Sequence, residues 1–374
     1  MLFEFKVNDD IIASSDQRMT LKKDKTYIAN KFWTKRIPIS SQPIPIETKD
    51  YKIDININDK KLLIIMSSGL GDVLFLTPLI NTIKQKYPNC YIGFATAKPN
   101  QDILQIIDNI NQTIDYPIDK EKFDTFDYVI RLEDLSKTSE ENKERNIYEL
   151  FLEHIGITDI QPEMCRPYIK ENVLKNIEVK ENLIGIHPFA TDHIRHLNFN
   201  LVLELCKKLD YNIVLFSNKK EMEEHQHRFQ GTKVKWAIQS INNIMSTTRL
   251  LAQCEFVIAT DSVITHLAQA IGKKCICLYG PFSANSRVKY YENITIIDNN
   301  PDCRCALHQF DRCPKGFSNS PCLFFDPDMI IDIINDTAII QHPTLLNNTV
   351  TKYNWENNNV KEEEITEEKT EENN

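Results

Sequence analysis

Short apolar runs alternate with longer amphipathic stretches along most of the chain, beginning at residue 61. This alternation is typical of βαβ units, in which parallel strands form a sheet and helices cover it. The first series predicts strands at 62–66, 91–95 and 128–132 and helices near 73–87, 101–107 and 145–155. The second predicts strands at 183–187, 213–217, 256–259 and 275–279 and helices near 201–209, 220–229, 241–253 and 262–271. The predicted fold class is α/β, with two Rossmann-like domains in tandem, at 61–175 and 176–340.

The two ends of the chain have a different pattern. Residues 1–60 are rich in Ile, Thr and Tyr, are interrupted by Pro38, Pro43 and Pro45, and lack a sustained helical period. They predict a small β-rich extension followed by a linker. Residues 341–374 form a polar, acidic tail with almost nothing to bury, so we expect it to be disordered.

Charge and composition exclude some classes of protein. The formal net charge is -9, and residues 351–374 alone contain eight Glu and three Lys. A general nucleic-acid binder needs an excess of Lys and Arg, so nucleic acid is not an expected partner. The N-terminus is acidic where a secretory signal would be basic, and no apolar run is long enough to span a membrane. A cytoplasmic location is expected, with room for peripheral membrane contact.

The first candidate site is the SSGLGD segment at residues 67–72, between an apolar strand and an amphipathic helix. Small residues there allow close approach to the backbone, and a helix N-terminus favours anions. A dinucleotide fingerprint needs a third Gly where Leu74 stands, which disfavours NAD. Asp72 can be a helix N-cap, a reactive carboxylate or both.

The second candidate is ATDSVITHLA at residues 259–268, again a strand that runs into a helix. Asp261 or Ser262 can cap this helix, and its first-turn amides could bind a phosphate. His266 follows about one turn later and is either a ligand contact or a polar residue between helix and sheet. A third segment, HPFATDHIRH at 187–196, contains Arg195, which suits bidentate phosphate binding but can equally be a solvated surface residue.

Four late cysteines form the fourth candidate. Cys303, Cys305, Cys313 and Cys322 lie in a loop, residues 303–322, that is too polar to be stabilised by apolar burial. A structural iron or zinc ion would stabilise such a loop, although the C-x-C spacing is tighter than usual for zinc. Four reduced thiols are the alternative.

Two segments together carry a family resemblance: KLLIIMSSGLGDVLFLTPLINTIKQKYP at 61–88 and FVIATDSVITHLAQAIGKKCICLYGP at 256–281. They resemble the signature regions of glycosyltransferase family 9, the ADP-heptose:lipopolysaccharide heptosyltransferases. The resemblance covers about residues 61–336 and implies the GT-B fold, in which two Rossmann-like domains face a cleft.

The resemblance also implies roles for individual residues. Asp72 corresponds to the general base, and Ser68, Gly69 and Gly71 belong to the acceptor loop. The implied donor-binding residues are Arg195, Glu221, Asp261, Ser262, Val263, Thr265 and His266, with Glu221 on the ribose. Val263 replaces the usual Gly and Leu197 the usual Trp, which makes the donor class more secure than the donor itself.

The N-terminal extension and the late cysteines resemble a subgroup, the bacterial autotransporter heptosyltransferases, whose cysteines bind iron and whose acceptor is protein. The expected activity is inverting, metal-independent transfer of a sugar from a nucleotide-diphospho-sugar, such as ADP-heptose, to a lipopolysaccharide, other glycan or protein hydroxyl. No catalytic cofactor is expected. The alternative is a non-catalytic nucleotide-sugar-binding protein of the same fold.

Overall fold

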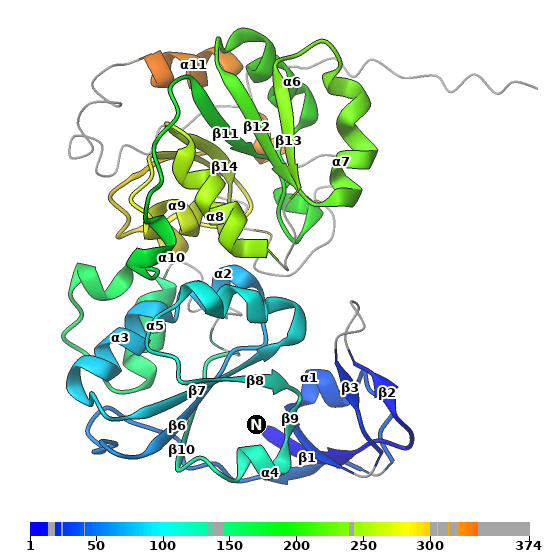
Figure 1. Cartoon of the computed structure of the whole chain (residues 1–374), viewed down its shortest axis with the longest axis vertical. Helices are drawn as coiled ribbons and strands as arrows, with labels where there is room; N and C mark the ends of the chain where they lie inside the picture. Colours follow the sequence, from blue (N-terminus) through cyan, green and yellow to red (C-terminus); the bar gives the residue numbers. More distant parts are fainter. Residues whose placement is uncertain are drawn as a thin grey trace, which may run out of the picture.

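In the computed structural model, the described residues are 1–335 except 14–18, 24, 41, 134, 136–144, 239–242, 300–304, 306–312 and 314–320. The predicted acidic tail and Cys303 lie outside them. The described chain forms two α/β parts, one above the other in Figure 1, with the N-terminal strands beside the lower part.

The first part contains a parallel sheet in the order β10-β6-β7-β8. Its strands are β6 (Lys61–Ile65), β7 (Tyr91–Ala97), β8 (Gln112–Tyr116) and β10 (Tyr128–Arg131). One face packs against α2 (Leu70–Leu74), α3 (Thr77–Lys86), η1 (Lys98–Ile106) and α5 (Ile147–His154). The expected helix at 101–107 is the 3-10 helix η1, and the expected helix at 73–87 is divided.

Pro78 explains that division. A proline has no amide hydrogen, so Pro78 cannot continue the ladder to the Leu74 carbonyl, and it lies in the first turn of α3. The Thr77 hydroxyl donates to that carbonyl at 2.8 Å instead. The break leaves α2 as a separate short helix at the end of β6.

A second, antiparallel sheet covers the other face. It has the order β5-β1-β4-β9. Its strands are β1 (Leu2–Lys6), β4 (Thr26–Asn30), β5 (Ile44–Ile46) and β9 (Ile118–Asp119). A separate two-stranded sheet is formed by β2 (Ile11–Ile12) and β3 (Thr20–Leu21). Two short helices, α1 (Lys31–Thr34) and α4 (Lys120–Phe123), belong to the same region. Because side chains alternate along a strand, Leu62 and Ile64 face the helices while Leu63 and Ile65 pack with Phe5 of this sheet. The N-terminal strands therefore replace a helical layer of the first domain.

The second part is built on a parallel sheet in the order β13-β12-β11-β14-β15-β16. Its strands are β11 (Leu183–His187), β12 (Asn212–Ser217), β13 (Val234–Ile238), β14 (Val257–Thr260), β15 (Cys275–Tyr279) and β16 (Ile294–Asp298). Its helices include α6 (Phe199–Lys208), α7 (Lys219–His225), α8 (Ile244–Gln253), α9 (Val263–Ala270), α10 (Asn285–Val288) and α11 (Pro327–Asn335). Shorter 3-10 turns are η3 (Pro162–Cys165), η4 (Glu171–Leu174), η5 (His193–Arg195), η6 (Gln226–Phe229) and η9 (Pro321–Leu323).

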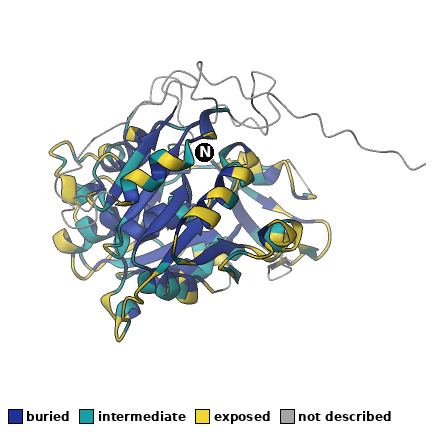
Figure 2. Cartoon of the chain, turned by 90° about the horizontal axis from the view of Figure 1, so that it is seen from above, coloured by how far each residue is buried: buried dark blue, intermediate teal, exposed yellow. Residues whose placement is uncertain are grey.

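Three strands, β8, β13 and β16, were not predicted. Each lies at the edge of its sheet and carries polar residues such as Gln112, Lys235 and Thr295. Edge strands need fewer apolar residues than central strands, so their apolar pattern is weak. Figure 2 shows the contrast between the buried central strands and the exposed faces of the helices around them.

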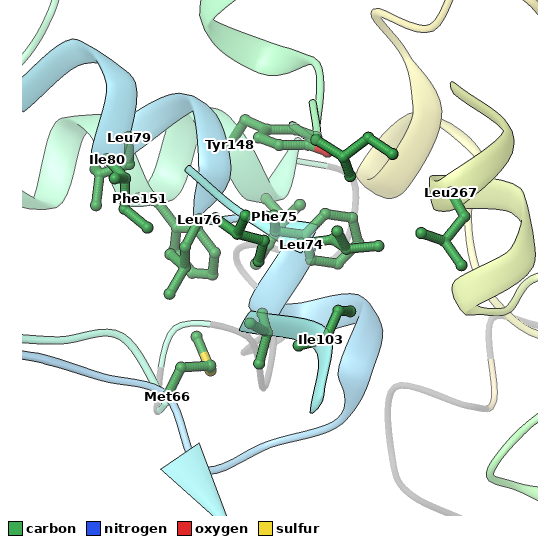
Figure 3. Packing of buried hydrophobic residues seen from close by; sticks show 14 of the residues in the cluster. Met66, Leu74, Phe75, Leu76, Leu79, Ile80, Ile103, Tyr148, Phe151 and Leu267 are labelled. Atoms are coloured by element: carbon green, nitrogen blue, oxygen red, sulfur yellow. The ribbon is translucent and has the colours of Figure 1, made fainter. Parts of the chain in front are cut away.

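Apolar side chains join the two parts. Leu267 of α9 faces Leu74 and Phe75 from the first part, and all three belong to one buried cluster (Figure 3). Beside them, the Tyr148 and Tyr291 hydroxyls are 2.7 Å apart, one from each part. This contact brings the carboxyl end of β6 against the start of α9.

Candidate active site

Asp72 lies at the junction of the two parts, in the first turn of α2. The N-cap of α2 is Gly69, and the Asp72 Oδ2 accepts a 3.1 Å hydrogen bond from the Gly69 amide. Asp72 is therefore not the N-cap itself, because its carboxylate reaches back from the third helical position. Oδ2 thus accepts a hydrogen bond from the backbone, whereas no hydrogen bond to Oδ1 is found among the described residues.

The electrostatic surroundings of Asp72 come from both parts of the molecule. Burial raises the pKa of Asp72, whereas the charge of Arg287, the Gly69 hydrogen bond and the charge of Arg195 lower it. A carboxylate in such a position can be ionised and still be a better proton acceptor than a solvated one.

The start of α9 differs from the sequence-based expectation. Ser262 occupies the N-cap position, but its hydroxyl is 2.9 Å from His187 Nδ1 and caps no amide of the helix. Burial lowers the pKa of His187 to about 3, so this partner is neutral. The expectation that the Ser262 side chain caps α9 is wrong, because the buried His187 competes for the hydroxyl. The amides of Val263 and Ile264 thus lack a side-chain cap.

Thr265 faces away from the cleft. Its hydroxyl donates to the Thr260 carbonyl at 2.9 Å and lies 3.2 Å from Cys277 Sγ, and its amide bonds the Ser262 carbonyl. Its side chain is completely buried against the sheet. The predicted donor contact of Thr265 stays a prediction, and these contacts favour a structural role in fixing the first turn of α9.

Arg195 and Asp261 form an ion pair in this cleft. Arg195 Nη1 donates to the Asp261 carbonyl at 2.9 Å and to its carboxylate at 3.3 Å, while Nη2 contacts Asp192 at 2.9 Å. Tyr279 also donates to Asp261. Arg195 Nε is enclosed and has no partner among the described residues. The guanidinium is therefore fixed in place and retains one unused donor.

His266 connects α9 to the first domain. Its Nδ1 lies 3.0 Å from the Tyr291 hydroxyl, and its ring packs 4.5 Å from the ring of Phe75. A β-carbon added to Gly71 would lie 3.2 Å from the His266 ring, so the glycine allows this close approach. Burial lowers the pKa of His266 to about 4. His266 can offer a neutral hydrogen bond here, but no charge.

Glu221 lies apart from this centre, on α7. Its carboxylate accepts from the Asn218 amide at 2.7 Å and its amide donates to the Asn218 side chain at 2.8 Å, which completes a capping box. Burial raises the pKa of Glu221, and His193 is close enough to lower it. Nearby, the rings of Phe199 and His225 stack at 3.8 Å.

The segment predicted to be the acceptor loop is partly open. Gly69 is exposed and Ser68 half-buried, and the Ser68 carbonyl accepts from Asn100 of η1. Leu197, where the family usually has Trp, is buried in the core of the second part.

The tertiary structure adds one residue to the site, Arg287, because its charge acts on Asp72. Sequence reasoning missed Arg287 because it lies outside every motif.

Of the four late cysteines, three are described. Cys305 and Cys322 are buried and Cys313 is half-buried, and none of the three is in a disulfide. Cys305 packs with Ile194, and Cys322 Sγ lies beside Gly280 at the end of β15. The described residues contain no group of three metal-ligating side chains, and Cys303 lies outside them.

Comparison with known proteins shows a similarity to one family over much of the second part of the chain. The sequence model of glycosyltransferase family 9 (heptosyltransferase) matches residues 159–315. Lipooligosaccharide heptosyltransferase 2 of Haemophilus influenzae is 20% identical over 342 residues, which cover 74% of this chain and 98% of the relative. The chain is thus similar to glycosyltransferase family 9, most directly over residues 159–315.

Solved structures support a GT-B fold. ADP-heptose lps heptosyltransferase II of E. coli has a TM-score of 0.56 at 15% identity and covers 75% of this chain and 98% of its own. The iron-containing dodecameric glycosyltransferase TibC of enterotoxigenic E. coli H10407 has a TM-score of 0.56 at 13% identity, with 89% of this chain and 90% of its own covered. A second TibC structure contains ADP-D-beta-D-heptose.

The wider TibC coverage concerns the N-terminal strands. Residues 61–374 make up about 84% of this chain, so an alignment over 89% includes part of residues 1–60. Among the described residues, moreover, no helix combines the length and apolar character that crossing a bilayer requires.

Proposed function

We propose that this protein transfers a sugar, a heptose, from an ADP-linked donor to an acceptor hydroxyl, with inversion at the anomeric carbon. One observation carries the proposal. Asp72 lies on α2, where Gly71 allows His266 of α9 to approach closely, and the charge of Arg195 acts on its carboxylate. At the start of α9 the Ser262 side chain is turned to His187, and Arg195 is fixed by Asp261. A candidate base and a candidate anion site thus lie close together.

In this reaction the acceptor oxygen attacks the anomeric carbon and its proton passes to Asp72. The bond between that carbon and the donor phosphate oxygen breaks, and the electron pair leaves with the nucleoside diphosphate. Arg195 and the Val263 and Ile264 amides would stabilise the charge that develops on the leaving group. His266 would contribute a neutral hydrogen bond, and no metal is needed for these steps.

The names of similar proteins support the proposal that the donor is ADP-heptose. The relatives and neighbours include heptosyltransferases, and one TibC structure contains ADP-D-beta-D-heptose. Glu221, Asp261 and Ser262 complete the proposed donor site, with Glu221 on the ribose. Ser68, Gly69 and Gly71 are proposed to border the acceptor.

The acceptor class is the less constrained part of the proposal. A protein acceptor is favoured by the N-terminal sheet, which the TibC alignment includes, whereas a lipopolysaccharide acceptor is favoured by the other relatives. The late cysteines would supply soft thiolate ligands, which suit iron or zinc in a structural role. Cys305, Cys313 and Cys322 with Cys303 are the proposed ligands.

Nucleotide binding and turnover on the purified protein test the proposal. ADP and ADP-heptose should raise the melting temperature more than UDP and UDP-glucose do, since a ligand that binds the folded state stabilises it. ADP release from ADP-heptose should follow. A preference for UDP would contradict the donor assignment. Val263 stands in place of the usual Gly and favours a second candidate function, a nucleotide-sugar-binding protein without turnover. Such a protein would be stabilised by ADP-heptose but would release no ADP from it.

A further inference from the structure

Arg287 carries a buried positive charge that has no ion-pair partner in the described part of the chain. The side chain is 8% exposed, and its Nη1 is enclosed with no hydrogen-bond partner. Among the described residues no carboxylate lies within ion-pairing distance of Arg287. Burying a cation without an anion is unfavourable, so such a group indicates that an anion binds there.

The position of Arg287 is fixed from both domains. Its guanidinium lies over the rings of Phe282, at 5.1 Å, and of Phe75, at 5.8 Å, the latter from the first domain. Its helix α10 is tied to α5, because Asn146 Nδ2 donates to the Asn285 carbonyl at 3.0 Å. The guanidinium is therefore preorganised before any ligand binds.

Arg287 and Arg195 are arranged around one centre. Both charges lower the pKa of Asp72, and both act on His266. Both carry an enclosed nitrogen without a partner, Nη1 of Arg287 and Nε of Arg195. Arg195 is on the nucleotide side, paired with Asp261, whereas Arg287 contacts Phe75 on the acceptor side. Both guanidinium groups also lie over the ring of Phe282, that of Arg195 at 5.5 Å and that of Arg287 at 5.1 Å. Two guanidinium groups against one ring can bind the two phosphates of a diphosphate.

We propose that Arg287 is a second catalytic cation, which binds the outer phosphate of the donor diphosphate and stabilises its charge as the sugar departs. This inference rests on the proposed function. The outer phosphate is the one bonded to the sugar, so it must lie on the side of the acceptor and of Asp72. As the bond from the anomeric carbon to the phosphate oxygen breaks, that oxygen keeps the electron pair, and Arg287 donates to the phosphate that carries it.

Calorimetry with ADP, AMP and inorganic pyrophosphate on wild type, Arg287→Met and Arg287→Lys tests the assignment. Arg287→Met should weaken ADP and pyrophosphate binding by about 10- to 100-fold and AMP binding by less than about 3-fold, because only the outer phosphate loses a charge-assisted hydrogen bond. Arg287→Lys should restore part of the loss, and kcat should fall in the same order.

Arg166→Met is the matched control. Arg166 also joins the two domains, through the Tyr290 carbonyl at 2.7 Å and Glu292 at 2.9 Å, but it does not contact the cleft residues. It should leave the ADP to AMP ratio unchanged. Melting temperatures of all variants identify a loss of folding.

Three results would overturn the assignment: equal losses for ADP and AMP in Arg287→Met, unchanged ADP binding, or an increase in acceptor KM alone. The last would mean that the guanidinium binds an anionic acceptor. If the wild type binds pyrophosphate but not ADP, the proposed donor is wrong, and a selective loss of pyrophosphate in Arg287→Met would still support the role of Arg287.

Discussion

The two oxygens of Asp72 have different surroundings, and a single substitution tests what this means. Asp72→Asn keeps an oxygen that can accept from the Gly69 amide, so stability should change by only a few tenths of a kcal/mol. If Asp72 is the general base, an asparagine amide in its place cannot accept the proton of the acceptor hydroxyl, and kcat of Asp72→Asn should fall on the order of 10²- to 10⁴-fold. Rate and melting temperature are to be measured on the same preparation.

Asp210→Asn is the matched control for Asp72→Asn, since Asp210 is an exposed carboxylate paired with Lys233 and the same substitution there should leave kcat unchanged. If Asp72→Asn transfers sugar at close to the wild-type rate while ADP affinity is unchanged, another group is the base.

The second prediction at the scale of single residues concerns Arg195. Removing it as Arg195→Ala should weaken nucleoside-diphosphate binding by about 1.5–3 kcal/mol, the usual contribution of a charged hydrogen bond. Because Asp261 is then left buried without its cation, the melting temperature should fall as well. Calorimetry with ADP is the measurement.

Asp192→Asn is the control for Arg195, since Asp192 is a half-exposed partner of the same guanidinium and should have only a small effect. Unchanged ADP affinity in Arg195→Ala would remove this residue from the donor site.

At the scale of elements, a chain of hydroxyl and imidazole groups joins α5, α9 and the segment after α10. Tyr148, Tyr291 and His266 are linked at 2.7 and 3.0 Å, all buried. Tyr291→Phe should lower the free energy of unfolding by about 1–3 kcal/mol, because it leaves buried polar groups of Tyr148 and His266 unpaired. Urea unfolding of single and double Phe variants gives the coupling.

Tyr148→Phe should cost less once Tyr291 is already Phe, because the bond between them is then absent. Additive losses in the double variant would contradict a connected chain.

At the scale of the whole molecule, the N-terminal sheet should be required for folding. Deleting residues 1–46 would expose Leu63, Ile65, Ala95 and Ile114, which now lie under that sheet. Exposed apolar surface of this kind favours aggregation. The truncated chain should therefore be insoluble or bind a hydrophobic dye. A soluble truncated chain with the wild-type melting temperature would show that this sheet is dispensable.

Metal content is the second test at this scale. Four thiolates bind iron or zinc tightly, so protein never exposed to chelator should contain close to one equivalent of iron plus zinc. Elemental analysis measures it. Cys90→Ser is a control, because Cys90 is buried before β7 in the first part, in another cluster than Cys322, and should leave the metal content unchanged. Less than about half an equivalent in the wild type would favour four reduced thiols.

The sequence alone predicted the central strands and the segments that follow them. β6, β11, β14 and β15 are buried on both faces, so their apolar runs are nearly continuous and easy to recognise. Asp261 follows such a strand directly, and Asp72 and Arg195 lie seven and eight residues after the ends of β6 and β11. The carboxyl ends of parallel strands share one edge of a sheet, so local pattern predicted that each residue lies near such an edge.

Only the tertiary structure decided the rest. Ser262 turns to His187 instead of capping α9, and Arg287 arrives at the cleft from a segment without any motif. The N-terminal strands take the place of a helical layer because alternate residues of β6 need an apolar cover. These features depend on contacts between residues far apart in the chain. Local periodicity reports which face of a segment is apolar, but not which distant segment comes to cover it.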